Sequence, residues 1–417
     1  MQDARHVWHP YTRMSAVDAG APPSIVRGEG IYLFDEAGCR YTDAIASWWC
    51  CALGHGHPRI VEAIRRQAGE LQHSILGNLS HPRAEELAER LAQLMPSPDR
   101  HVLFASDGAS AVEAALKIAL QFRTNTGQSS KRRFAYLAEA YHGDTLGAVS
   151  VGYLENFHKP FESVLFPAFE APVPLSAEQE DACFKKTAAL LAKHRDDLTA
   201  LIVEPLCQGA AGMRMYSPAY LRRLAELCRE NDVLLIADEI ATGFGRTGRM
   251  FAFEHAGIDP DIVCVGKALS AGYLPISATI VKDAVYRTFS DTPDDHSFYH
   301  GHTFCGNPVA AAAALEALRV YKEARIWEKA AALEHVFRDV LEPLKTRPGV
   351  KGVRVLGAIA AVELNSVDAA WAVRDRLLAR RILARPLGAV VYLMPPLNIG
   401  REVATELARS LLDAITA

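Results

Sequence analysis

Between about residue 60 and about residue 310, short apolar runs alternate with helical patterns. A strand, a helix and then another strand is the order typical of a mostly parallel sheet covered on both faces. The sequence therefore predicts an α/β domain, and ligands of such sheets bind beyond the carboxyl ends of the strands. The strands expected are 102–105, 134–137, 201–203, 233–237 and 262–265, with helices at 111–120 and 220–230.

The two ends of the chain have a different pattern. A short strand is expected at 30–35, and alanine-rich helices at 307–324 and 327–344. Two more strands, at 353–356 and 358–363, precede a final helix from 402. We expect a smaller α+β domain built from residues 1–55 and 310–417 beside a large domain of residues 56–309. The segment 170–182, rich in proline, serine and glutamate, is expected to be an exposed loop.

Composition excludes several classes of function. The chain has 417 residues, of which 50% are hydrophobic, enough for two or three domains. Its net charge of −4 does not favour nucleic acid or an anionic membrane as a partner. No apolar run approaches the roughly 20 residues that span a bilayer, and the first ten residues lack a signal core. The eight cysteines form no C-x-x-C pair, so we expect reduced thiols in a cytoplasmic protein rather than disulfides or a metal site.

Lys267 and Asp238 each follow an apolar strand, and they lie 29 residues apart (267 − 238). Burial lowers the pKa of an amine and makes it a nucleophile toward carbonyls. A carboxylate can hold a ring nitrogen protonated. Together the two groups suit pyridoxal phosphate, with Lys267 as its Schiff-base lysine and proton carrier and Asp238 against the pyridine nitrogen. The alternatives are a lysine that extends to the surface and an aspartate that caps the next turn.

Gly108, Ala109 and Ser110 open a helix directly after a strand. Their N–H groups and the helix dipole suit a phosphate, although a plain cap by Ser110 or Asp107 explains the same residues. Tyr141 follows the next strand, where its ring either stacks on a flat cofactor or packs half-buried.

Glu204 also follows a strand. It either orders the phenolic side of the cofactor or pairs with an arginine such as Arg246. The glycine-bounded loop Gly301-His-Thr-Phe-Cys-Gly-Asn-Pro308 precedes a long helix. Thr303 in this loop either donates to the phosphate or belongs to a simple helix-start turn.

With these residues the chain resembles the class III pyridoxal-phosphate aminotransferases of fold type I over nearly its whole length. The most specific segments are Leu235-Ile-Ala-Asp-Glu-Ile-Ala-Thr-Gly-Phe-Gly-Arg-Thr-Gly248 and the loop 301–308. The resemblance implies a homodimer with shared active sites, in which Thr303, beside His302, contacts the phosphate held by the neighbouring subunit. The cofactor-binding positions that it implies are Gly108, Ala109, Tyr141, Asp238, Lys267, His302 and Thr303, and Lys267 is the catalytic residue.

Further segments narrow the resemblance: Trp8-His-Pro-Tyr-Thr12, Ser47-Trp-Trp49, Gln208-Gly-Ala-Ala-Gly-Met-Arg-Met-Tyr216, Arg385-Pro-Leu-Gly388 and Tyr392-Leu-Met-Pro-Pro396. They imply a ping-pong transaminase that moves the amino group of S-adenosylmethionine to 8-amino-7-oxononanoate, giving 7,8-diaminononanoate for biotin formation. Aromatic rings could wall the apolar chain of that substrate, and an arginine could bind its carboxylate. The substrate-binding positions implied are Tyr11, Trp48, Tyr141, Lys267, Gly301 and Arg385. Without the resemblance, core packing would be the preferred interpretation of the two tryptophans.

The chain departs from the family pattern at two positions. Ala109 stands where serine is usual, with Ser110 as a possible source of the hydroxyl, and His302 where proline is more common. Lysine as donor, and a class III enzyme acting on diamines, 4-aminobutyrate or other omega-amines, are the alternatives within the family. Outside it, the alternatives are a non-catalytic protein of this fold and a metal-dependent enzyme, for which His55-Gly-His57 lacks partners at ligand spacing.

Overall fold

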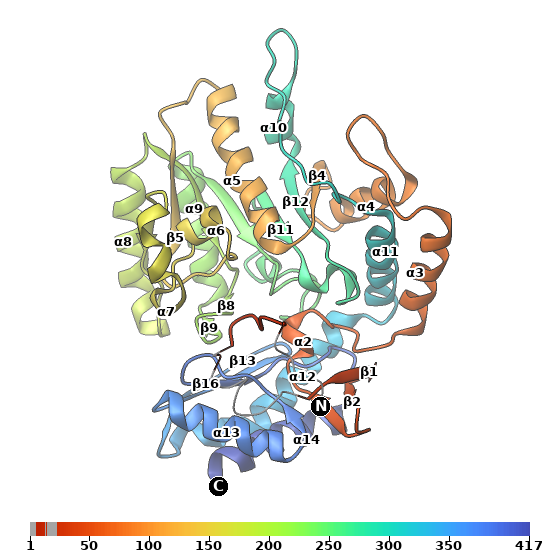
Figure 1. Cartoon of the computed structure of the whole chain (residues 1–417). Helices are drawn as coiled ribbons and strands as arrows, with labels where there is room; N and C mark the ends of the chain where they lie inside the picture. Colours follow the sequence, from red (N-terminus) through yellow and green to blue (C-terminus); the bar gives the residue numbers. More distant parts are fainter. Residues whose placement is uncertain (1–5, 13, 15–22) are drawn as a thin grey trace.

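A computed structural model describes residues 6–12, 14 and 23–417 (Figure 1). Its largest sheet has seven strands in the order β4-β12-β11-β10-β7-β5-β6. Every pair is parallel except the two made by β12, which runs antiparallel to β11 and β4. The mostly parallel sheet predicted from the sequence is therefore confirmed. The strands are β4 (Arg100–Ala105), β5 (Arg133–Leu137), β6 (Phe169–Ala171), β7 (Leu198–Val203), β10 (Leu234–Asp238), β11 (Ile262–Val265) and β12 (Ser277–Lys282).

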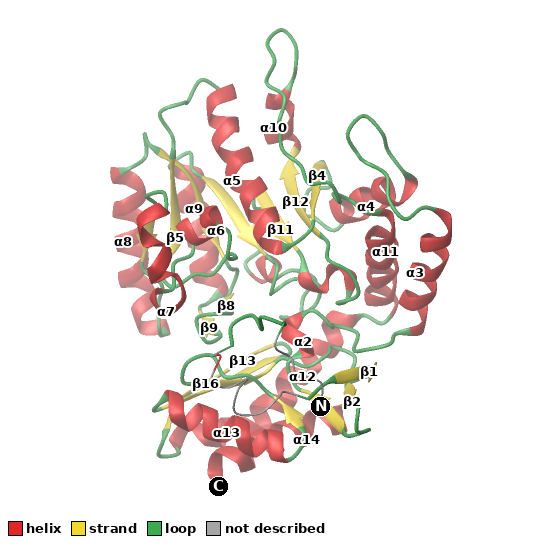
Figure 2. Cartoon of the chain, viewed as in Figure 1, coloured by secondary structure: helices red, strands yellow, loops and turns green. Residues whose placement is uncertain are grey.

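Helices cover both faces of this sheet (Figure 2). Successive residues of a strand point to opposite faces, and the central strands are apolar on both. Ile202, Ile236 and Ile262 lie side by side and pack under α5 (Gly108–Asn125). Leu201 and Leu235 face the other way, in the cluster that includes α9 (Pro218–Glu230) and α8 (Glu180–Lys193). Burial on two faces fixes the sheet and thus the positions of the residues at its strand ends.

The two ends of the chain meet in smaller sheets in the lower part of Figure 1. Strand β15 (Ile382–Leu383) pairs in parallel with β3 (Arg40–Asp43), beside β2 (Tyr32–Asp35) and β1 (Ile25–Glu29). A second sheet joins β13 (Val350–Leu356), β14 (Ile359–Leu364) and β16 (Val390–Leu393). The boundaries 55/56 and 309/310 stay a prediction, because one apolar cluster runs from Ile31 through Phe104 to Leu411. Residues 1–5, 13 and 15–22 of the predicted segment 1–55 lie outside the described residues.

The segment 170–182 differs from the expected loop. Its start belongs to edge strand β6, and its end holds η2 (Ala177–Gln179) and the first turn of α8. In the described part of the chain, no helix is both long and apolar enough to cross a membrane. The remaining elements are α2 (Ala46–Trp49), α3 (Pro58–Glu70), α4 (Pro82–Gln93), α6 (Leu146–Ser150), α7 (Glu155–His158), η1 (Lys159–Val164), β8 (Cys207–Gln208), β9 (Arg214–Met215), η3 (Ala252–His255), η4 (Lys267–Ser270), α10 (Asp283–Tyr286), η5 (Arg287–Phe289), α11 (Pro308–Glu323), α12 (Ile326–Leu341), η6 (Glu342–Thr346), α13 (Val367–Ala379) and α14 (Arg401–Thr416).

Candidate active site

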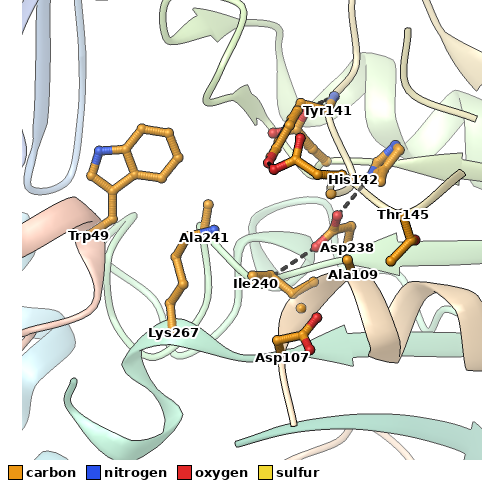
Figure 3. Close-up of a pocket in the computed structure, with 14 residues that line it drawn as sticks. Trp49, Asp107, Ala109, Tyr141, His142, Thr145, Asp238, Ile240, Ala241 and Lys267 are labelled. Carbon is orange, nitrogen blue, oxygen red and sulfur yellow. Dashed lines mark hydrogen bonds and ion pairs between the residues drawn. The ribbon is translucent and has the colours of Figure 1, made fainter. Parts of the chain in front are cut away.

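A cavity of about 470 Å³ opens at the carboxyl ends of β4, β5, β7, β10 and β11 (Figure 3). Parallel strands bring their carboxyl ends to one edge of the sheet, so residues far apart in sequence line one space. Six of the candidate positions named from the sequence contribute to its wall, namely Gly108, Ala109, Tyr141, Glu204, Asp238 and Lys267. The lining residues are Trp49, Asp107, Gly108, Ala109, Tyr141, His142, Gly143, Asp144, Thr145, Glu204, Asp238, Ile240, Ala241 and Lys267.

Lys267 begins η4 and directs its side chain into this cavity (Figure 3). Its Nζ lies 5.2 Å from the centre of the Trp49 ring. Burial lowers the pKa of Lys267, although the carboxylates of Asp238 and Glu204 favour its charged form. The amine therefore loses its proton more readily than a surface lysine does. The alternative of a lysine that extends to the surface does not describe this side chain.

Asp238 is only 4% exposed at the end of β10, and it lines the same cavity. Its Oδ2 lies 2.6 Å from His142 Nδ1, and its Oδ1 accepts the Ile240 N–H at 3.0 Å. The expected cap of the next turn is therefore present, but it occupies one oxygen only. His142 fixes the other oxygen from behind, a role that the sequence pattern did not indicate although His142 directly follows Tyr141.

The first turn of α5 forms another wall. Asp107 caps the helix by accepting the Ser110 N–H at 3.0 Å, and it also accepts the Ser110 hydroxyl at 2.9 Å. The suggestion that Ser110 supplies the hydroxyl missing at Ala109 stays a prediction, and in this structure that hydroxyl donates to Asp107. The N–H groups of Gly108 and Ala109 belong to the turn where a helix has no acceptor of its own, so they suit an anion.

Glu204 is 4% exposed and accepts two backbone N–H groups, from Tyr141 at 3.0 Å and from Gly209 at 2.9 Å. Burial raises its pKa to about 7. Arg246 instead donates to the Pro395 carbonyl oxygen at 2.6 Å. The alternative in which Glu204 pairs with Arg246 is therefore wrong. Glu204 instead joins the loop of Tyr141 to the loop of Gly209 through its two hydrogen bonds.

Four of the six predicted substrate positions form a cluster at the outer side of the cavity. The Tyr11 hydroxyl donates to Asp144 and lies 3.4 Å from the Tyr141 hydroxyl. Arg385 donates to the Tyr11 carbonyl oxygen at 2.6 Å, and its guanidinium lies 4.5 Å from the centre of the Trp48 ring. Tyr11 and Trp48 meet edge to face with ring centres 5.7 Å apart. We call Tyr11, Trp48, Tyr141, Asp144 and Arg385 the outer cluster.

Trp48 and Trp49 point to different parts of the site because they lie in a left-handed turn. The residues Ala46, Ser47, Trp48 and Trp49, labelled α2, all have positive φ, between 44° and 74°. This conformation costs about 1–2 kcal/mol for each non-glycine residue. Ser47 donates to Asp43 Oδ2 at 2.8 Å, and Trp49 Nε1 donates to the Tyr392 hydroxyl at 3.1 Å. Trp49 therefore lines the inner cavity while Trp48 joins the outer cluster.

The structure does not bring Gly301, His302 and Thr303 to the cavity of their own chain, since none of them is among its lining residues. They lie on the loop before α11, where Gly301 and Thr303 are exposed. No atom outside its neighbours comes within 4 Å of a Cβ built on Gly301. Their predicted contacts stay a prediction that depends on a second subunit.

The residues present fit pyridoxal phosphate. Gly108 and Ala109 offer N–H donors for a phosphate, and Asp238 offers a buried carboxylate for a ring nitrogen. Lys267 offers an amine of lowered pKa, and Tyr141 an aromatic wall. The Nε2 atom of His142, buried behind Asp238, has no partner in the described chain.

Comparisons with known proteins agree with this geometry. A family model described as aminotransferase class-III matches residues 15–415. The adenosylmethionine-8-amino-7-oxononanoate aminotransferase of Synechococcus elongatus is 42% identical over 402 residues, which cover 94% of each chain. The crystal structure of the Methanocaldococcus jannaschii protein of the same name matches with a TM-score of 0.95 at 37% identity, covering 99% of this chain and 97% of that one.

A structure of the omega transaminase from Pseudomonas jessenii in complex with PMP is similar at lower identity. It matches with a TM-score of 0.94 at 30% identity and covers 99% of this chain and 96% of that one. Both the sequence match and the fold match therefore extend over nearly the whole chain. The chain belongs to the class III aminotransferases, a family that uses pyridoxal phosphate.

Proposed function

We propose that this aminotransferase moves the amino group of S-adenosylmethionine to 8-amino-7-oxononanoate and so forms 7,8-diaminononanoate for biotin synthesis. The observation that carries the proposal is the outer cluster, which places an arginine and two aromatic rings next to the cavity of Lys267. The relatives that match over almost the whole chain are named for the same pair of compounds. Structural neighbours at lower identity are omega transaminases, so another amine substrate is the second candidate.

Pyridoxal phosphate, when bound, supplies a carbonyl group that accepts amines and a ring that takes up negative charge. We assign its phosphate to the N–H groups of Gly108 and Ala109. Asp238 would keep the ring nitrogen protonated, with its carboxylate held in place by His142 and the Ile240 N–H. Lys267 would take a proton at Nζ from the alpha carbon of the substrate and deliver it to the carbon that carried the cofactor's carbonyl group, since burial lowers the pKa of its amine.

The outer cluster suits a long apolar acid. Arg385 can bind a carboxylate through two parallel N–H donors, and stacking on Trp48 holds its guanidinium plane. The rings of Tyr11 and Trp48 give the apolar chain a surface to pack against. Asp144 gives the same region a negative charge that attracts a cationic donor, either a sulfonium or the second ammonium of lysine. Burial alone would raise the pKa of Asp144, but the nearby His158 and the hydrogen bonds from Tyr11 and Tyr141 outweigh it and lower the pKa.

We further propose a homodimer in which Gly301, His302 and Thr303 reach the site of the partner subunit. The loop after α3 and the loop before α11 support the homodimer. These two loops are neighbours, because the Asn307 side chain donates to the Gln72 carbonyl oxygen at 2.9 Å. Both loops expose apolar side chains, which on one side of a protein mark an interaction surface. The exposed residues are Ile75 at 52%, Leu79 at 59%, Tyr299 at 82% and Phe304 at 60%. Sedimentation velocity should show a species of two chains, and a monomer would contradict this part of the proposal.

A cytoplasmic location is part of the same proposal. All eight cysteines are free, and Cys50 and Cys51 keep their sulfur atoms 4.0 Å apart. Reduced thiols at this density are typical of a reducing compartment. We also retain the division into a large domain of residues 56–309 and a smaller one from the two ends.

The decisive experiment mixes the purified, cofactor-loaded protein with 8-amino-7-oxononanoate and one donor at a time. Diaminononanoate is then measured by mass spectrometry. Product with S-adenosylmethionine is the expected result, and product with lysine alone would change the donor. Absence of product with every donor, including simple diamines, would refute the proposed reaction.

Two lysine variants test the assignment of the catalytic residue. Lys267→Ala should abolish both product formation and the visible absorbance band of the loaded protein. Lys329→Ala removes an exposed lysine on α12 and serves as the control. Turnover that persists in Lys267→Ala would show that a different lysine carries the reaction.

A further inference from the structure

We infer that His158 is a positioning residue of the active site, which holds the Asp144 carboxylate in line with the hydroxyl groups of Tyr11 and Tyr141. His158 ends the short helix α7, outside every segment that identifies the family. The inference rests on the proposed function in one respect only, namely that the outer cluster binds substrate.

The contacts of His158 fix its tautomer. The Leu154 N–H donates to Nδ1 of His158 at 3.0 Å, so Nδ1 acts as an acceptor and carries no proton. A neutral imidazole keeps one proton, which must then reside on Nε2. Backbone geometry at the start of α7 therefore decides which nitrogen of this side chain is a donor.

The Nε2–H group of His158 points toward the site. Its side chain is 3% exposed, and Nε2 lies 3.9 Å from Asp144 Oδ1. No other hydrogen-bond partner for this nitrogen exists among the described residues. A buried N–H without a partner is costly, and the Asp144 carboxylate is an acceptor that a small movement would bring into reach. A movement of about 1 Å would bring the two atoms to a normal hydrogen-bond length.

The Asp144 carboxylate accepts from both tyrosine hydroxyl groups, so its orientation also sets theirs. The Tyr141 hydroxyl donates to Asp144 Oδ2 at 2.9 Å, and the Tyr11 hydroxyl donates to Oδ1, the oxygen that faces His158. Both hydroxyl protons are thus directed at the carboxylate, which leaves the oxygen lone pairs free to accept from a substrate N–H. Without His158, the carboxylate would be free to rotate, and the two hydroxyl groups would lose their common orientation.

Packing supports the same role. The imidazole of His158 stacks on the Tyr141 ring with 17° between the planes and 6.1 Å between the centres. The preceding residue, Phe157, meets the Tyr11 ring edge to face at 5.4 Å. One short helix therefore touches both tyrosines of the outer cluster from behind, and it does so with adjacent residues.

Two substitutions of His158 separate a positioning role from simple packing. In His158→Gln the side-chain amide replaces the Nε2 donor, whereas in His158→Asn it replaces Nδ1 and cannot reach Asp144. The cofactor-loaded proteins are mixed with each amine substrate in stopped-flow half-reactions, which give the apparent substrate Kd and the limiting rate separately. We expect His158→Asn to raise the apparent Kd about tenfold, as for the loss of one hydrogen bond to a charged group. His158→Gln should stay within about threefold of the wild type, with cofactor absorbance unchanged in both.

The same pair of proteins in an Asp144→Asn background completes the test. If His158 acts through the carboxylate, His158→Asn should change the substrate Kd less than about twofold there. An equal loss in the Gln and Asn variants, a loss that persists in the Asp144→Asn background, or no loss at all would each overturn the inference. The half-reactions need only an amine that the wild-type protein accepts. A failure to form diaminononanoate would thus refute the proposed reaction and still leave this test decisive.

Discussion

Gly143 lies between Tyr141 and Asp144 in the loop after β5, and it packs against Ala109 in the first turn of α5. Its φ is +128°, a conformation that side chains rarely adopt. A Cβ at this position would lie 2.4 Å from the Ala109 Cβ and 2.8 Å from its Cα. Gly143→Ala should therefore push the two phosphate-side walls of the cavity apart.

The loss of stability expected for Gly143→Ala has two parts, one from the backbone conformation and one from the steric overlap. Forcing a side chain into this backbone region costs about 1–3 kcal/mol. Inserting a methyl group into filled space costs about 1–3 kcal/mol more. We expect Gly143→Ala to lower the free energy of unfolding by roughly 2–6 kcal/mol. The matched control is Gly127→Ala, where φ is +75° but nothing lies within 4 Å, and which should lose about 1–2 kcal/mol.

Urea unfolding of the cofactor-free proteins, followed by circular dichroism, measures both losses. Equilibrium dialysis then gives the Kd for pyridoxal phosphate, which should rise in Gly143→Ala and not in Gly127→Ala. Ala109→Gly removes the closest atom and should restore about 1 kcal/mol when combined with Gly143→Ala. Equal losses of stability in the two alanine variants, or no rescue by Ala109→Gly, would refute the steric reasoning.

Three further predictions concern side chains of the site. Asp238→Asn should lower kcat by about 100-fold or more in steady-state assays with the fold intact by circular dichroism, because it removes the negative charge that we propose beside the ring nitrogen. Cys50 should react with iodoacetamide at a rate that rises through about pH 7, since a hydrogen bond from Cys51 lowers its pKa to about 7 and the thiolate forms above that pH. Cys50→Ser is the control. A midpoint of the rate near the usual thiol pKa of about 8.5 would contradict the prediction for Cys50. Arg385→Lys should raise the KM for 8-amino-7-oxononanoate about tenfold and leave the KM for the donor within twofold, because a lysine cannot form the paired contact to a carboxylate.

Sequence patterns were sufficient to locate the candidate site residues that follow strands. Asp238 and Lys267 lie at the ends of β10 and β11, so an apolar run followed by a polar residue located both. The contacts behind them were not predictable in this way. His142 reaches Asp238 across 96 positions, and nothing in the local pattern indicates that pairing.

The turn at Ala46–Trp49 shows a second limit. Left-handed backbone is normally signalled by glycine or asparagine, and this segment contains neither. Its conformation depends on partners elsewhere, since Asp43 holds Ser47 and Tyr392 holds Trp49. Local propensity predicts an ordinary helix or strand there, and only tertiary contacts select the observed turn.

The outer cluster draws on separate parts of the chain, and this has a consequence for binding. Tyr11 comes from the N-terminal segment, Trp48 from α2, Tyr141 from the large sheet and Arg385 from the loop before β16. A substrate that touches all four connects segments that otherwise meet through exposed side chains such as Tyr11, which is 42% exposed. Binding of such a substrate would therefore also hold Tyr11 in place beside the cavity, and part of the binding free energy would be spent on this. Removing one member of the cluster should weaken binding by more than its own contact, since the remaining members lose the residue that aligns them.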